Sequence, residues 1–187
     1  MNGARYLFPK PYADFVAKLR VPCGFLLLVA FALLSRPTVL SIQVGLPVAG
    51  VGLLLRGWAA GHLAKNRELA TSGPYAYIRN PLYAGTLIAA SGIVIAGRSV
   101  WLAAIFAAVF SLIYLPVIEL EEQHLRNIFS AYASYAERVP RLFPRGRWPA
   151  AQPGRFSWTL YLKNEEYKAL LGLAAAVIWL LFRLRLA

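Results

Sequence analysis

Apolar residues occur along this chain in long continuous blocks. Five blocks are long or nearly long enough to cross a bilayer, and they cover residues 21–34, 39–57, 81–97, 100–118 and 169–186. A membrane-crossing helix needs roughly 20 predominantly apolar residues, so the first block is short unless residues 15–20 form its leading turn. The pattern predicts an all-α integral membrane bundle of about five transmembrane helices in a single domain, residues 1–187.

The pattern becomes periodic after the fourth block. Large apolar side chains recur at three- and four-residue steps from Leu125 to Val139, with charged residues between them. This spacing predicts one amphipathic helix on the cytoplasmic side of the membrane. Prolines at positions 140, 144, 149 and 153 then exclude regular helix until about Trp158.

Two junctions between blocks have clear local signals. Asn80-Pro81 predicts a helix start, because Asn is a preferred N-cap and Pro is favoured at the first helical position. Residues 97–99, Gly-Arg-Ser, leave room only for a turn, so the third and fourth spans should form a tight hairpin. We expect small residues to let these two spans pack closely: Gly85, Ala89, Ser91, Gly92 and Ala96 against Ala103, Ala104, Ala107 and Ala108.

Composition and charge support the membrane assignment. Apolar residues make up 59% of the 187 and charged residues only 15%, whereas about 25% is usual for a soluble domain. The net charge of +12 would suit a nucleic-acid partner, but its distribution argues against one. Of the 20 Lys and Arg residues, all but four fall on one side of the predicted spans; the four are Arg36, Arg98, Arg183 and Arg185. This asymmetry predicts that the N-terminus and residues 119–168 lie on the cytoplasmic side, with membrane lipids as partners.

The scarce acidic residues point to a candidate site. Glu119, Glu121 and Glu122 lie where the fourth span leaves the membrane, and the chain has only eight acids. The antiparallel hairpin should bring Glu121 and Glu122 close to the start of the third span, at Arg79, Asn80 and Tyr83. Carboxylates at a membrane edge are functional candidates. The alternative is that the acids pair with headgroup-facing arginines and that the tyrosines form an interfacial aromatic belt.

These residues resemble a family of membrane methyltransferases that includes isoprenylcysteine carboxyl methyltransferases and phospholipid N-methyltransferases. The first shared element is Gly73-Pro74-Tyr75-Ala76-Tyr77-Ile78-Arg79-Asn80-Pro81-Leu82-Tyr83-Ala84-Gly85, and the second is Glu121-Glu122-Gln123-His124-Leu125. A tail of Phe129, Tyr132, Tyr135, Val139-Pro140 and Pro144 follows. In this chain Asn80 stands where the family pattern usually has His. The resemblance assigns residues 45–148 to a methyltransferase-like core and 149–187 to an additional C-terminal segment with the fifth span.

The resemblance implies transfer of a methyl group from S-adenosylmethionine to a lipophilic acceptor in the membrane, such as a phospholipid amine or a lipophilic thiol or carboxylate. It implies four catalytic residues: Arg79, Tyr83, Glu121 and Glu122. Because adjacent helical residues point about 100° apart, we expect one acid to face the cavity and the other to face basic residues of 138–147, and the resemblance favours Glu121 as the inward acid. The implied cofactor-binding residues are His62, Tyr75, Arg79, Asn80, Pro81, Tyr83, Gly85, Glu121, Val139, Pro140 and Leu142. No metal is expected.

Two other functions remain open at this stage. Sterol-type double-bond reductases share a related membrane core and a similar Arg-x-Pro-x-Tyr element, but they use NADPH and need a longer chain. A non-catalytic membrane protein is the third possibility. Binding of S-adenosylmethionine would distinguish the first function from the other two.

Overall fold

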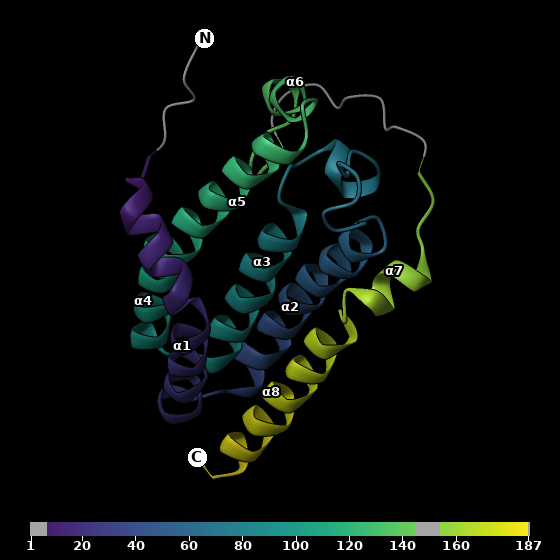
Figure 1. Ribbon diagram of the computed structural model, residues 1–187. Helices are drawn as coiled ribbons and strands as arrows, with labels where there is room; N and C mark the ends of the chain where they lie inside the picture. Colours follow the sequence, from purple (N-terminus) through teal and green to yellow (C-terminus); the bar gives the residue numbers. More distant parts are fainter. Residues whose placement is uncertain (1–6, 145–153, 187) are drawn as a thin grey trace.

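The computed structural model describes residues 7–144 and 154–186, and within these ranges all regular structure is helical (Figure 1). The elements are α1 (Lys10–Leu34), α2 (Val39–Ala60), the 3₁₀ turn η1 (Gly73–Ala76), α3 (Pro81–Gly97), α4 (Val100–Val109), a π-helical turn (Phe110–Tyr114), α5 (Leu115–Ile128), α6 (Tyr132–Arg138), α7 (Trp158–Lys163) and α8 (Tyr167–Arg185).

The bundle belongs to a multi-pass membrane protein, as the sequence predicts. Four helical stretches in the described ranges are long and apolar enough to cross a membrane: Lys10–Leu34, Val39–Ala60, Val100–Ile128 and Tyr167–Arg185. The fifth predicted span, α3, is also apolar but has only 17 residues. The first span begins at Lys10, so residues 15–20 do contribute to it.

Local sequence signals set several helix ends. The Thr38 hydroxyl accepts a hydrogen bond from the Ser41 amide, and the Ser41 hydroxyl accepts one from the Thr38 amide, which makes a capping box at the start of α2. At the predicted hairpin turn, Arg98 has a φ of 47° and ends α3 in the left-handed conformation. The Ser99 side chain then caps α4. The turn between these helices is therefore as short as predicted.

The prediction that the small residues on α3 pack against α4 is wrong. Gly85, Ala89, Gly92 and Ala96 face α2, not α4, and the backbones of α2 and α3 touch. A Cβ atom on Gly52 would lie 2.3 Å from the Ala89 nitrogen, and one on Gly92 would lie 2.3 Å from the Ala49 nitrogen. Because α2 has its own row of small residues, the two helices approach along complementary grooves. This contact holds α3 in the middle of the bundle (Figure 1).

The fourth span contains a π-helical turn that α1 contacts. Pro116 has no amide hydrogen, so the carbonyl of Leu112 cannot accept the usual α-helical hydrogen bond from four residues later. The Tyr12 hydroxyl donates to this carbonyl at 2.8 Å. Val16 on α1 also packs against Ile113 and Val117. The irregular turn thereby fixes α1 against the fourth span, and a π-helical turn of this kind often accompanies a functional site.

The predicted amphipathic helix is two helices. The fourth span continues without interruption into α5, and the extended backbone of Phe129 (φ −124°, ψ 108°) ends it. α6 then follows in a new direction. The bend lets Tyr132, Tyr135 and Val139 form a buried cluster, and the Tyr135 hydroxyl donates to the Tyr75 carbonyl at 2.7 Å. A straight helix would carry these tyrosines away from η1.

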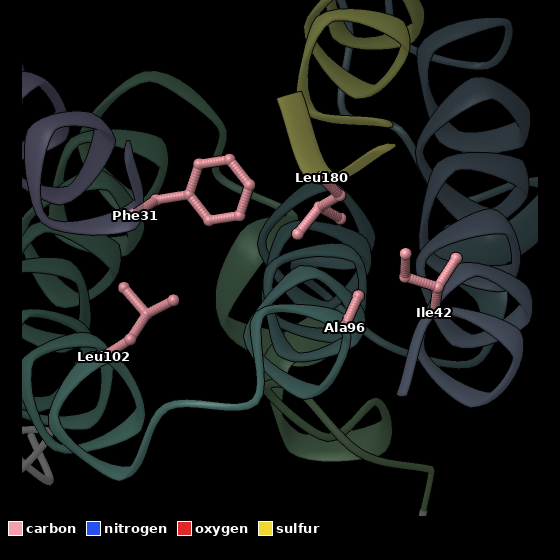
Figure 2. Close-up of a cluster of buried hydrophobic side chains, with 5 residues drawn as sticks. All are labelled: Phe31, Ile42, Ala96, Leu102 and Leu180. Atoms are coloured by element: carbon pink, nitrogen blue, oxygen red, sulfur yellow. The ribbon is translucent and has the colours of Figure 1, made fainter. Parts of the chain in front are cut away.

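The opposite end of the bundle holds an apolar cluster to which five helices contribute. Figure 2 shows Phe31 from α1, Ile42 from α2, Ala96 from α3, Leu102 from α4 and Leu180 from α8. Beside it, the Arg183 guanidinium donates from Nη2 to the Ser35 carbonyl at 2.9 Å, and the Arg36 amide donates to the Gly97 carbonyl at 2.7 Å. The four basic residues predicted on the sparsely charged side therefore lie at this end.

Candidate functional site

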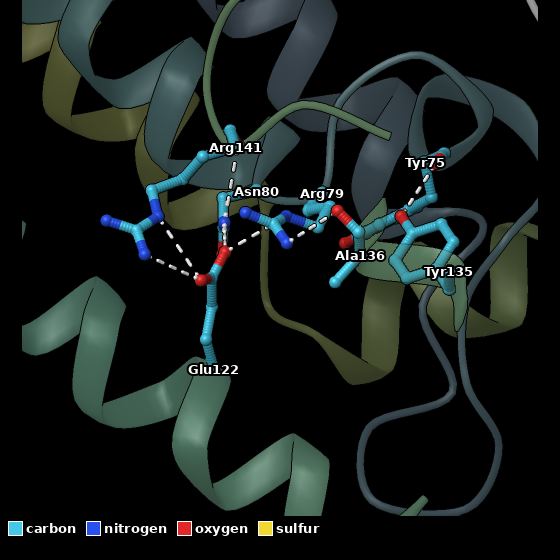
Figure 3. Close-up of polar contacts among 7 residues, drawn as sticks. All are labelled: Tyr75, Arg79, Asn80, Glu122, Tyr135, Ala136 and Arg141. Atoms are coloured by element: carbon cyan, nitrogen blue, oxygen red, sulfur yellow. Dashed lines mark hydrogen bonds and ion pairs between the residues drawn. The ribbon is translucent and has the colours of Figure 1, made fainter. Parts of the chain in front are cut away.

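Glu122 on α5 is the centre of a buried polar network (Figure 3). This residue is 4% exposed. Asn80 donates from Nδ2 to Oε1 at 2.9 Å, and Arg141 donates from Nη2 to Oε2 at 3.0 Å. The Nε atom of Arg79 lies 3.2 Å from Oε1 as an ion pair, without hydrogen-bond alignment. A carboxylate withdrawn from water is stable only with partners of this kind, so the network fixes α5 against the start of α3.

Backbone hydrogen bonds continue the network into the segment after α6. The Arg79 amide donates to the Pro140 carbonyl at 2.8 Å, and the Asn80 amide donates to the Arg141 carbonyl at 3.1 Å. Arg79 also donates from Nη1 to the Ala136 carbonyl at 3.1 Å. Asn80 occupies the predicted N-cap position of α3, but its side chain makes no capping bond because it is engaged by Glu122.

Glu121 points away from this network into a cavity. The hydroxyl of Tyr83, in the first turn of α3, donates to Glu121 Oε2 at 2.7 Å. Both residues line a cavity of about 700 Å³, a volume within the usual range for small-molecule sites. Adjacent helical residues point about 100° apart, and the structure accordingly separates the acids: Glu121 lies in the cavity wall, and Glu122 lies behind it against Arg79 and Arg141.

The cavity has a polar end and an apolar side. Tyr75, Arg79, Asn80 and Pro81 join Tyr83 and Glu121 in its wall, so six of the predicted cofactor-binding residues meet here. The apolar side comes from α1, with Val21, Phe25 and Leu28. These three side chains are largely exposed on the surface of the bundle, Phe25 at 66%. Because α1 is long and apolar enough to cross a membrane, we expect this side of the cavity to face the lipid.

The tyrosines beside the cavity are neutral hydrogen-bonding groups. Burial raises the pKa of Tyr75 and Tyr135 far above the usual phenol value, and the Tyr132 pKa is raised by the same cause. All three line the cavity, and the Tyr132 hydroxyl is buried without a partner in the described residues. Neutral aromatic rings around a cavity can hold a cation by cation–π contacts.

Five predicted cofactor-binding residues lie outside the cavity wall. His62 contacts the Ser72 hydroxyl at 3.1 Å and packs beneath Gly73, and burial lowers its pKa. Gly85 faces Arg56 and α2, because it belongs to the α2–α3 contact. The remaining three follow α6: Val139, Pro140 and Leu142. Val139 packs against Tyr132 and Tyr135, and the Pro140 carbonyl accepts from the Arg79 amide, so these two support the wall from behind, whereas Leu142 is half-buried outside it.

Several wall residues were missed by the sequence analysis. Arg20, Arg56 and Tyr114 line the cavity from α1, α2 and the π-helical turn. In the charge pattern the two arginines contribute only to the predicted topology. Their positions at the ends of apolar spans were a usable signal, since charged residues inside membrane helices often mark functional sites. Nothing in the sequence pattern singled out Tyr114.

Comparison with known proteins identifies the type of core. Residues 49–132 match the model of the phospholipid methyltransferase family. The resemblance predicted from sequence is therefore confirmed over this stretch, which contains the start of α3 and both acids of the site. No solved structure matches the chain.

Three curated relatives are similar to parts of the chain. The cobalt-zinc-cadmium resistance protein CzcN of Cupriavidus metallidurans is 34% identical over 66% of this chain and 56% of its own length. The nickel-cobalt-cadmium resistance protein NccN of Alcaligenes xylosoxydans xylosoxydans is 38% identical over 55% and 48%. Phosphatidylethanolamine N-methyltransferase B of Dictyostelium discoideum is 32% identical over 46% and 42%. The chain thus spans about half the length of the curated relatives it matches.

Proposed function

We propose that this chain, whose residues 49–132 match the phospholipid methyltransferase family, transfers a methyl group from S-adenosylmethionine to a lipophilic acceptor held in the membrane. One observation carries the proposal: the Glu121–Tyr83 pair lies in the wall of a cavity that is polar at one end and lined along α1 by exposed apolar side chains. A water-soluble donor and a membrane acceptor can meet only in a site with both properties.

The residues of the polar end fit the methyl donor. S-adenosylmethionine carries a sulfonium cation, a carboxylate and an adenosine group, and when bound it supplies an activated methyl group. Glu121 offers a negative charge to the cation, and the buried tyrosines offer aromatic faces. Arg79 and the first turn of α3, which Leu82 and Tyr83 bring to the cavity, offer positive charge to the carboxylate.

The proposed role of the wall is alignment. Methyl transfer from a sulfonium is an in-line displacement, so it depends on positioning and exclusion of water. The Tyr83 hydroxyl fixes the Glu121 carboxylate, and Glu122 fixes the backbone at Arg79 and Asn80 from behind. We expect Tyr83→Phe to lower methyl transfer roughly 10- to 100-fold, because one charge-assisted hydrogen bond contributes about 1.5–3 kcal/mol.

Ligand binding to the purified full chain in lipid nanodiscs tests the donor. We expect S-adenosylmethionine to bind and NADPH not to bind. Binding of NADPH alone would favour a sterol-type reductase, and binding of neither would favour a non-catalytic membrane protein. Glu121→Gln keeps the size of the side chain and removes its charge, so it should weaken binding of the donor.

The acceptor is proposed to be an amine, thiol or carboxylate on a lipid-soluble molecule. Cells that express the chain and grow on methyl-deuterated methionine should accumulate a labelled lipophilic product, detectable by mass spectrometry of the lipid extract. Cells that express Glu121→Gln are the matched control. An identical labelled lipid profile in both cultures would contradict the proposal.

A role in metal resistance is a second proposal, favoured only by the names of two relatives. In the described ranges, no group of three or more His, Cys, Asp or Glu side chains could hold a metal ion. We propose that any such role would act through the methylated product. Resistance to cadmium or cobalt should then require Glu121, and a Glu121→Gln strain that keeps full resistance would separate resistance from methyl transfer.

A further inference from the structure

Residues 154–186 lie outside the stretch that matches the family. They contact the end of α2 that lines the cavity. The Asn164 side chain donates from Nδ2 to the carbonyls of Ala60 and Leu63, both at 2.9 Å. The Ser157 amide donates to the Gly61 carbonyl at 2.9 Å. A helix leaves its last carbonyls without partners, and here Asn164 satisfies two carbonyls at and just beyond the end of α2. Leu63 itself lines the cavity.

A buried ion pair ties the same segment to the cavity wall. Glu166, the residue before α8, is 6% exposed and accepts two hydrogen bonds from Arg56 on α2. Arg56 donates from Nε to Oε1 at 2.5 Å and from Nη2 to Oε2 at 2.9 Å. The remaining Nη1 donates to the Thr86 hydroxyl and faces the Leu82 carbonyl on α3. This two-pronged geometry fixes the plane of the guanidinium.

The charges of Arg56 and Glu166 have opposite electrostatic effects on the cavity wall. Arg56 lines the cavity, and so does Tyr75. Burial is the main reason that the Tyr75 pKa is raised; the Glu166 charge raises the pKa further, and the Arg56 charge lowers it. A cationic side chain in the wall is therefore opposed by an anion from a different part of the chain.

We propose that Glu166 is a positioning residue of the active site, which holds the Arg56 guanidinium in the cavity wall and cancels its charge there so that a positively charged methyl donor is admitted. This inference rests on the proposed function. The donor carries a sulfonium cation, whereas its demethylated product, S-adenosylhomocysteine, is a neutral thioether at the same atom. An unopposed guanidinium should thus repel the donor more than the product.

The experiment compares the affinities of donor and product for the full chain in nanodiscs. Glu166→Gln should lower the affinity for S-adenosylmethionine relative to S-adenosylhomocysteine by about tenfold. Arg56→Gln leaves the Glu166 charge unopposed, so it should raise the ratio of the affinity for S-adenosylmethionine to the affinity for S-adenosylhomocysteine. Glu165→Gln is the matched control, because Glu165 is exposed and pairs with Lys168; its ratio should equal that of the wild type.

The outcomes separate the inference from the proposed function. A wild-type chain that binds neither ligand overturns both. A wild-type chain that binds both ligands, with ratios unchanged in Glu166→Gln and Arg56→Gln, leaves the function intact and overturns the inference. If Glu166→Gln fails to fold, Arg56→Gln and the double variant decide: the double variant should return the ratio to the wild-type value within about threefold, because no net charge remains.

Discussion

Replacement of each paired acid by Gln should separate stability from catalysis. Glu122 is buried and contacts two guanidiniums and one amide (Figure 3). Loss of one partner from a buried ion pair costs about 3–5 kcal/mol. Arg141 is one-third exposed, and Gln retains an acceptor for Asn80, so we expect about 3 kcal/mol for Glu122→Gln. That cost corresponds to a fall in melting temperature of about 6–12 °C for a chain of this size.

Glu121→Gln should impair methyl transfer rather than stability. Its carboxylate lies in the cavity wall and has the Tyr83 hydroxyl as its partner, so Gln should change the melting temperature little and methyl transfer greatly. Thermal unfolding followed by intrinsic fluorescence in detergent, and transfer of radiolabelled methyl groups to lipid extract, measure the two effects. A Glu122→Gln protein that melts like the wild type would refute the buried network as the support of the site. Equal loss of activity with no loss of stability in both variants would refute the division of roles.

Four further predictions concern helix packing, access, orientation and pH. Gly52→Ala should destabilise the chain by about 1–3 kcal/mol in chemical denaturation, because its Cβ would strike α3, whereas Gly50→Ala meets open space and should be neutral. Phe25→Trp should narrow the lipid-facing side of the cavity, and should raise the apparent KM for the acceptor without changing donor affinity. Arg155→Cys, in a variant without the native cysteine, should react with membrane-impermeant maleimide only after cells are opened; labelling of intact cells would reverse the proposed orientation. Because burial lowers the His62 pKa, its contribution to stability is present above about pH 6.5 and is lost as the pH falls below that value; melting curves of His62→Gln should lack this part of the pH dependence.

Local signals in the sequence were sufficient to bring the paired acids close to the start of α3. Asn80-Pro81 sets the start of α3, and the short turn at Arg98 forces α3 and α4 to be antiparallel neighbours along the chain. These two facts place Glu121 and Glu122 beside the start of α3. The prediction succeeded because each step depends only on residues close in sequence.

Packing choices between distant elements could not be read from the sequence. Small residues on α3 fit small residues on either α2 or α4, and the sequence pattern gives no reason to choose α2. The bend at Phe129 carries neither Gly nor Pro, so no local signal predicts it. In the structure the Tyr135 hydroxyl bonds to the Tyr75 carbonyl beyond the bend, a contact between residues 60 positions apart. No sequence motif surrounds Glu166. Its contact with Arg56 is evident only in the structure, where α8 lies against α2.

The Arg56–Glu166 pair has a consequence for biosynthesis. The two residues are 110 positions apart, and chains grow at about 5–20 residues per second, so Arg56 enters the membrane roughly 5–20 seconds before its carboxylate partner is made. During that interval its long side chain must reach the interface from the end of α2 to remain hydrated. The cavity wall consequently acquires its final charge only when α8 has been inserted, and a nascent chain that does not yet expose Glu166 lacks the carboxylate partner of Arg56.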